Sequence, residues 1–71
     1  MELTMSEKIR IAMKRENLTL TDLAKATGQT RQNLSNKMAR DNFSVREAAT
    51  IAEALGAELI CKFRLPDGAE I

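Results

Sequence analysis

The sequence predicts a mainly α-helical domain of four to five short helices, followed by one C-terminal β-strand. Three observations predict this fold class. Residues 4–56 repeatedly place Ser or Thr just before apolar side chains spaced three and four apart, the pattern of capped amphipathic helices. Gly28 and Gly56 stand where such helices would end. Residues 57–65 instead alternate apolar and polar side chains, which is the period of a strand.

The first helix is predicted to begin after Thr4. Thr4 and Glu7 have the spacing of a capping box, in which each side chain accepts a hydrogen bond from the backbone of the other residue. One apolar face is then formed by Met5, Ile9, Ala12 and Met13. Asn17 is the predicted stop.

A second and a third helix are separated by a very short break. Thr19 is the predicted N-cap of the second helix, which should run to about Thr27. Gly28 can adopt the positive φ that ends a helix without steric cost. Thr30 can cap the third helix, which is expected over residues 31–40.

The fourth helix begins after Ser44, where Ser44 and Glu47 repeat the capping-box spacing, and it ends at Gly56. The strand is expected from Ala57 to Leu65, and Pro66-Asp67-Gly68 should terminate it. We therefore divide the chain into a helical domain, 1–56, and a C-terminal strand and tail, 57–71. The predicted core consists of Ile9, Met13, Leu23, Leu34, Phe43, Ile51 and Leu55.

The composition excludes several classes of function. Seventy-one residues make one small domain, and they include no histidine and a single cysteine, Cys61. An ordinary structural zinc site and an internal disulfide are thereby excluded. Nothing in the sequence pairs a nucleophile with an activating base, and no Gly-rich phosphate loop is present. We predict no enzymatic activity, no catalytic residue, no cofactor and no metal.

The sequence has no feature of a membrane protein or a secreted one. No stretch approaches about 18 consecutive apolar residues, the length of a membrane span. The N-terminal residues alternate charged and apolar side chains and lack the apolar run of a signal peptide. We therefore expect a cytoplasmic protein without a membrane partner.

Charge is distributed unevenly along the chain. The formal net charge is only +1, but residues 23–40 carry four basic side chains and no acidic one. Residues 41–71 carry six acids and three bases. One segment is therefore basic, as expected of a surface that meets phosphate groups. A solvated helix surface that happens to lack acids is the alternative interpretation.

The break around Gly28 makes the second and third helices a helix-turn-helix. About three residues are too few to let the helices lie antiparallel, so they must cross steeply, and the small Ala24 allows close contact. Leu34 and Met38 face inward on the third helix, so the opposite face points to solvent. The predicted base contacts on that outward side are Arg31, Gln32, Ser35 and Asn36. Arginine matches guanine and glutamine or asparagine matches adenine in the DNA major groove.

This pattern resembles the phage-repressor and Cro-like helix-turn-helix group, often called XRE. The resemblance covers roughly Ile9 to Leu55. It rests on Leu23-Ala24, on Gly28 four residues after the alanine, and on Leu34 six residues after the glycine. LTLTDLA precedes these positions, and a fourth helix ending in EALG follows them. The resemblance implies a lambda-repressor-like fold and sequence-specific binding to double-stranded DNA.

The chain departs from the family pattern at two positions. Lys37 stands where the family usually has an apolar residue three after Leu34, and Met38 is the expected replacement. Thr27 stands where an aliphatic residue usually precedes the glycine. Both departures concern the packing of the third helix.

Phosphate contacts are predicted around the base-reading face. The resemblance implies that Thr19, Arg40 and Asn42 meet phosphates or the flanking groove, and that Thr30 lies among the recognition-helix contacts. Thr19 and Thr30 are helix caps first, and the N–H groups that they flank can also meet a phosphate. The basic side chains should neutralise phosphates collectively. The complete predicted phosphate set is Thr19, Lys25, Thr30, Lys37, Arg40 and Asn42.

The predicted strand has no partner within the sequence, because no second strand-like run occurs. Its unpaired N–H and C=O groups favour pairing with a second copy of the chain as an antiparallel ribbon. Glu58 would then oppose either Lys62 or Arg64 of the other chain. The expected dimer strand comprises Glu58, Leu59, Ile60, Cys61, Lys62, Phe63 and Arg64.

Taken together, these features predict a small prokaryotic transcriptional regulator that occupies an operator as a homodimer, with its third helix in the major groove. The alternative is a protein-interaction module, such as an antitoxin-like partner, whose strand and acidic C-terminal half bind another protein. Salt dependence separates the two, because phosphate contacts weaken steeply as salt is raised.

Overall fold

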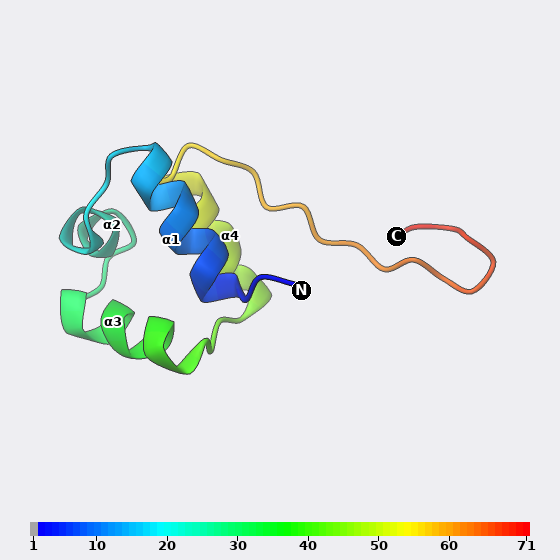
Figure 1. Ribbon diagram of the computed structural model, residues 1–71, viewed down its shortest axis with the longest axis horizontal. Helices are drawn as coiled ribbons and strands as arrows, with labels where there is room; N and C mark the ends of the chain where they lie inside the picture. The colour runs from blue at the N-terminus through cyan, green and yellow to red at the C-terminus, as the bar shows by residue number, and fades with distance from the viewer. Residues whose placement is uncertain (1) are drawn as a thin grey trace.

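The computed structural model describes residues 2–71 and consists of four helices followed by an extended tail (Figure 1). The helices are α1, Met5–Arg15; α2, Leu20–Ala26; α3, Arg31–Arg40; and α4, Val45–Ala54. The mainly α-helical fold class is confirmed, and the described residues form no fifth helix. None of the helices within residues 2–71 is both long and apolar enough to cross a membrane.

Each helix begins at the cap residue that the sequence predicts. In every case the cap side chain accepts a hydrogen bond from the backbone N–H three residues further on. The caps are Thr4, Thr19, Thr30 and Ser44. Complete capping boxes form in α1, α2 and α4, where the third helical residue is an acid that accepts from the N-cap backbone.

All four helices end in the same way. The chain leaves each helix through a residue with positive φ, and the N–H of the following residue bonds to a carbonyl in the last turn. These residues are Asn17, Gly28, Asp41 and Gly56, with φ from 51° to 71°. Asn and Asp tolerate this conformation better than most residues that carry a Cβ.

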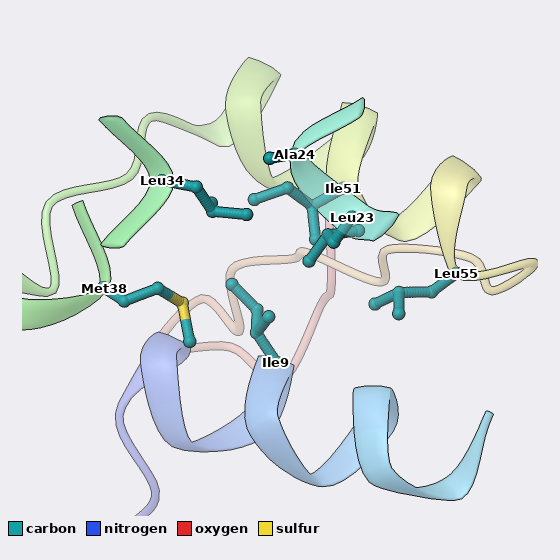
Figure 2. Packing of buried hydrophobic residues seen from close by; sticks show 7 residues of the cluster. All are labelled: Ile9, Leu23, Ala24, Leu34, Met38, Ile51 and Leu55. Atoms are coloured by element: carbon teal, nitrogen blue, oxygen red, sulfur yellow. The ribbon is translucent and has the colours of Figure 1, made fainter. Parts of the chain in front are cut away.

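One cluster of side chains from all four helices forms the core (Figure 2). Leu23 and Leu34 are 0% exposed and lie where α2 meets α3. Burying such a side chain contributes about 1.5–3 kcal/mol. The cluster consists of Ile9, Leu23, Ala24, Leu34, Met38, Ile51 and Leu55. Two predicted core residues, Met13 and Phe43, are only partly buried and pack against it.

A polar contact ties the end of α3 to the start of α1. Ser6 is the buried polar residue of the described core region, at 3% exposed. Its backbone N–H donates to Asp41 Oδ1 at 2.8 Å. Its hydroxyl lies 2.8 Å from the Met38 carbonyl and 2.9 Å from Asp41 Oδ1, so one hydrogen serves both acceptors. Asp41, at the C-terminal end of α3, thus also caps the first turn of α1.

The C-terminal segment differs from the predicted lone strand. Residues 58–62 make no backbone–backbone hydrogen bonds within the described chain, and the segment runs away from the helices (Figure 1). Residues 63–65 instead pair with residues 69–71 around a single bridge between Arg64 and Glu70, and the predicted strand over residues 57–65 does not form as a regular strand. The reason is Pro66-Asp67-Gly68, which forms a reversing turn, with Gly68 at φ +92° and its N–H bonded to the Leu65 carbonyl.

Candidate nucleic-acid interface

The turn between α2 and α3 is fixed first by its backbone. Gly28 has φ +70°, and its N–H donates to the Lys25 carbonyl at 3.2 Å. The N–H of Gln29 donates to the Ala24 carbonyl at 3.0 Å. These two bonds use carbonyls that the end of α2 would otherwise leave unsatisfied. The direction in which α3 leaves the turn is therefore set by hydrogen bonds.

Side chains reinforce the same turn. Asn33 Nδ2 donates to Gln29 Oε1 at 2.9 Å, and Gln29 Nε2 donates to Thr27 Oγ1 at 2.9 Å. The Thr27 hydroxyl in turn donates to the Leu23 carbonyl at 2.8 Å. The polar Thr27, which departs from the aliphatic residue that the resemblance predicts, is thus satisfied, and the chain of bonds links α2, the turn and α3.

Close packing holds the two helices together behind the turn. Ala24 is 2% exposed and belongs to the same core cluster as Leu34 (Figure 2). A larger side chain at residue 24 would push α3 away, because protein interiors leave no spare volume for it. The predicted close contact at Ala24 is consistent with this arrangement.

Gln32 and Asn36 lie one turn apart on the exposed side of α3. Gln32 Nε2 donates to Asn36 Oδ1 at 3.1 Å, so the two amides form one continuous polar surface. Arg31 at the start of the helix and Arg40 at its end are also exposed. Together they provide donors and acceptors of the kinds that match base edges, with a cation at each end.

Ser35 is less exposed than the other three predicted base contacts. It is half-buried and lines a groove formed by α1, α2 and α3. That groove is also lined by Arg10, Met13, Leu20, Met38 and Ala39. Ser35 therefore stands at the flank of the outward face, whereas Gln32 and Asn36 stand near its centre.

Lys37 lies on the opposite flank of α3, toward α4. Its ammonium group forms an ion pair with Glu47 Oε2, and the two side chains are 32% and 35% exposed. Glu47 Oε1 also accepts from the Ser44 backbone N–H at 3.1 Å, as part of the α4 capping box. The Glu47 carboxylate thus completes the capping box of α4 and partly neutralises the positive charge of Lys37.

The remaining predicted phosphate contacts are all exposed. Thr19 and Thr30 stand at the N-termini of α2 and α3, and Lys25 lies in the last turn of α2. Arg40 and Asn42 stand at the far end of α3, where the Asn42 N–H closes the helix on the Lys37 carbonyl at 3.2 Å. The exposed set thus brackets the outward face of α3 at both ends.

The N-terminus of α3 differs electrostatically from those of the other helices. Its third residue is Asn33, and its first turn contains no acid. In α1 and α2, by contrast, the backbone hydrogen bonds from Thr4 and Thr19 hold the pKa values of Glu7 and Asp22 below their usual range. The positive end of the α3 dipole is therefore not offset by a carboxylate of its own helix, which suits an approach to phosphate.

Metal ligation finds no support in this region. Within residues 2–71, no three His, Cys, Asp or Glu side chains lie close enough together to hold a metal ion.

Comparison with known proteins agrees with the geometry of the turn. The sequence model of the Cro/C1-type HTH DNA-binding domain matches residues 8–59, close to the region for which the resemblance was noted. Neither a curated protein nor a solved structure matches the chain significantly. The match covers most of the chain, and the family is described by DNA binding rather than by a reaction. The chain belongs to the Cro/C1-type helix-turn-helix family of DNA-binding domains.

Proposed function

We propose that this chain is a small prokaryotic transcriptional regulator that recognises a specific double-stranded DNA sequence by inserting α3 into the major groove. The observation that carries the proposal is the exposed Gln32–Asn36 pair. It lies on the second helix of a helix-turn-helix, the helix that enters the groove in such motifs. The turn behind it is fixed by both backbone and side-chain bonds.

Three side chains are proposed to read bases. Arg31 can donate two hydrogen bonds to the O6 and N7 atoms of guanine. Gln32 and Asn36 can each donate to N7 and accept from N6 of adenine. Ser35 is proposed as a lesser contact, because it is half-buried at the flank of the helix.

Phosphate contacts are proposed on both sides of this face. Thr19 and Thr30 would meet phosphates through the N–H groups that follow them, and the basic side chains would contribute by charge. The proposed set is Thr19, Lys25, Thr30, Lys37, Arg40 and Asn42. These contacts set the position of the protein on the duplex and carry no sequence information themselves.

Selection of bound duplexes from a random pool tests the proposal. We expect enrichment of one sequence, with guanine or adenine at the positions nearest α3. Affinity for the selected duplex should fall linearly as the logarithm of the salt concentration rises. A protein that enriches no sequence, and whose affinity for DNA is insensitive to salt, would contradict the proposal.

We also propose that the regulator acts as a homodimer joined through residues 57–71. Exposed apolar side chains support this: Ile60, Phe63 and Ile71 are 73–74% exposed. Phe63 and Ile71 lie opposite each other in the hairpin, and adjacent exposed apolar side chains of this kind are typical of interaction sites.

The same exposed side chains favour a second candidate, an antitoxin-like module in which the tail binds a different protein. That function would bury the tail against a partner without the salt dependence of DNA binding. Measuring the salt slope for DNA and for any purified partner separates the two candidates.

A further inference from the structure

The C-terminal hairpin leaves one backbone edge unused. Phe63 and Ile71 exchange both of their backbone hydrogen bonds, at 2.6 and 2.9 Å, and the Leu65 N–H donates to the Ala69 carbonyl at 2.7 Å. Alternate residues of a strand direct their N–H and C=O groups to opposite edges. The backbone N–H and C=O groups of Ile60, Lys62 and Arg64 therefore face away from residues 69–71. No residue of the described chain pairs with them.

The hairpin also has two unlike faces. Phe63 lies directly opposite Ile71, so their side chains share a face. Alternation along the extended segment puts Leu59, Cys61 and Leu65 on that same apolar face. The other face carries Glu58, Ile60, Lys62, Arg64 and Glu70.

The polar face carries two acids and two bases, but its charges are paired unevenly within one chain. Lys62 Nζ lies 3.2 Å from Glu70 Oε1, and Arg64 Nη2 lies 3.0 Å from Glu70 Oε2. Two cations therefore share one carboxylate. Glu58 is exposed and forms no ion pair within residues 2–71. In a second copy paired along this edge, the otherwise unpaired Glu58 would give these cations a further carboxylate.

We propose that this free edge pairs with the same edge of a second copy, in the register that sets Glu58 opposite Arg64 and Cys61 opposite Cys61. The inference rests on the homodimer proposed above and specifies its geometry. Two hairpins joined in this way form a four-stranded antiparallel sheet with the two-fold axis at Cys61. Glu58 of each copy faces Arg64 of the other, one of the two cations that share Glu70, and Leu59 faces Phe63.

The alternative register, with Glu58 opposite Lys62, is disfavoured by the end of α4. In that register Arg64 would have to pair with Gly56. Gly56 has φ +71°, and its N–H already donates to the Glu53 carbonyl at 3.0 Å, so it cannot join a strand. The alternative also replaces the contact between Leu59 and Phe63 with one between Leu59 and Cys61.

Cys61 makes the register measurable. In the proposed register the two Cys61 residues form a non-hydrogen-bonded pair with Cα atoms about 4.5 Å apart. A disulfide bridges Cα atoms about 4.4–6.8 Å apart, so the thiols can join under mild oxidation. In the alternative register the two cysteines are diagonal neighbours about 7–8 Å apart, beyond that limit.

The experiment oxidises the full-length chain without DNA and separates the products on a non-reducing gel. We expect the parent protein to shift to the mass of a disulfide-linked dimer, and C61S to remain at the monomer mass. A mixture of the parent with the variant L59C/C61S, made larger by a tag, then tests the register. The proposed register gives Cys61–Cys61 dimers and little mixed product. The alternative register gives mixed dimers, because residue 59 then opposes Cys61.

A predominance of mixed dimers would overturn the register, and a parent that neither cross-links nor sediments as a dimer would overturn the pairing itself. Binding to a duplex with a single half-site is measured separately. Salt-sensitive DNA binding without cross-linking would contradict this inference and leave the proposed DNA binding in place. Cross-linking without salt-sensitive DNA binding would contradict the proposed DNA binding and leave this inference in place.

Discussion

At the scale of single residues, the bond between Gln32 and Asn36 determines what each amide can offer to DNA. Gln32 gives one hydrogen of Nε2 to Asn36 and keeps its carbonyl oxygen and a second N–H. Adenine presents one donor and one acceptor in the major groove, so the carbonyl oxygen and the second N–H of Gln32 are complementary to it. Holding the amide in place before binding also lowers the entropy lost when the contact forms.

Replacing Gln32 with alanine should therefore affect specific binding. We expect a loss of about 1–3 kcal/mol on the selected duplex and a relaxed preference at one base position. Titrations of the parent and the variant against selected and random duplexes measure both effects. Equal losses on the two duplexes would argue against direct readout by Gln32.

The basic residues of α3 should not contribute equally. Arg40→Ala should reduce the salt slope by about one unit on any duplex, as expected for one lost phosphate contact. Lys37→Ala should reduce the slope by less, because Glu47 already shares the charge of Lys37. Glu47→Gln should strengthen binding to random DNA, since glutamine keeps the capping box and releases the lysine. A Lys37→Ala slope equal to that of Arg40→Ala would show that the ion pair is broken on DNA.

Acid should destabilise the domain through two capping carboxylates. Backbone hydrogen bonds from Thr4 and Thr19 lower the pKa values of Glu7 and Asp22 from 4.5 and 3.8. Folded pKa values below the unfolded ones mean that the unfolded chain binds more protons, so stability rises with pH here. The contribution is complete above the ordinary pKa values and is lost as the pH falls through the folded ones.

Thermal unfolding between pH 6 and pH 2 checks this expectation. The parent should lose stability below about pH 5, where carboxylates of ordinary pKa begin to protonate. The variant with Glu7→Gln and Asp22→Asn should lose less over the same range. Identical pH profiles for the two proteins would remove the capping carboxylates as the cause.

At the scale of the elements, local rules set where each helix starts and ends, but a long-range contact sets how α3 meets α1. Asp41 adopts φ +51° at the end of α3, and its carboxylate accepts from Ser6, 35 residues away. The C-terminal end of α3 is thus anchored to the first turn of α1. A shift of this anchor would tilt the helix that carries the proposed base contacts.

Two substitutions at Asp41 separate its backbone role from its role as an acceptor. Asp41→Asn keeps both the tolerance of positive φ and an oxygen acceptor, so we expect a small change in stability. Asp41→Gly keeps only the backbone conformation, and it should cost about 1–3 kcal/mol because the Ser6 groups lose their partner. Urea denaturation measures both variants. Equal stabilities for the two variants would show that the Ser6 contact contributes nothing.

At the scale of the whole molecule, the helices form the body and the tail extends from it along the 43 Å long axis (Figure 1). The core lies wholly within the helices, and the apolar side chains of the tail remain exposed. A homodimer joined through the tail would place two copies of α3 symmetrically. The preferred site should then be an inverted repeat with half-site centres about 34 Å apart.

Proline scanning of the tail should distinguish its two backbone edges. Lys62→Pro and Ile60→Pro each remove an N–H from the free edge, so we expect monomers in sedimentation and a loss of operator affinity that exceeds any loss of helix content. Cys61→Pro removes an N–H that points toward the opposite edge. Residues 69–71 pair with that edge only at residues 63–65, so the loss of the Cys61 N–H should leave the dimer intact. A parent that is monomeric well above its operator affinity, and that selects asymmetric sites, would contradict the dimer.

The sequence by itself determined where the helices begin and end and the spacing of the helix-turn-helix. The cap at Thr19, the stop at Gly28 and the cap at Thr30 depend on residues no more than five apart, so local spacing was enough to predict them. Burial of Leu23 and Leu34 followed from helical periodicity. The resemblance to the Cro-like family, which the family match confirms, depended on the same short-range spacings.

Only the tertiary structure decided which partners the polar residues take. The contacts between Ser6 and Asp41 and between Lys37 and Glu47 join residues on different helices, and no local spacing predicts them. Met13 and Phe43 are only partly covered, because coverage depends on where neighbouring helices lie. The tail was misjudged for the same reason. Its period of two was visible in the sequence, but whether residues 63–65 pair with another chain or fold back on residues 69–71 depends on the conformation of the turn at residues 66–68.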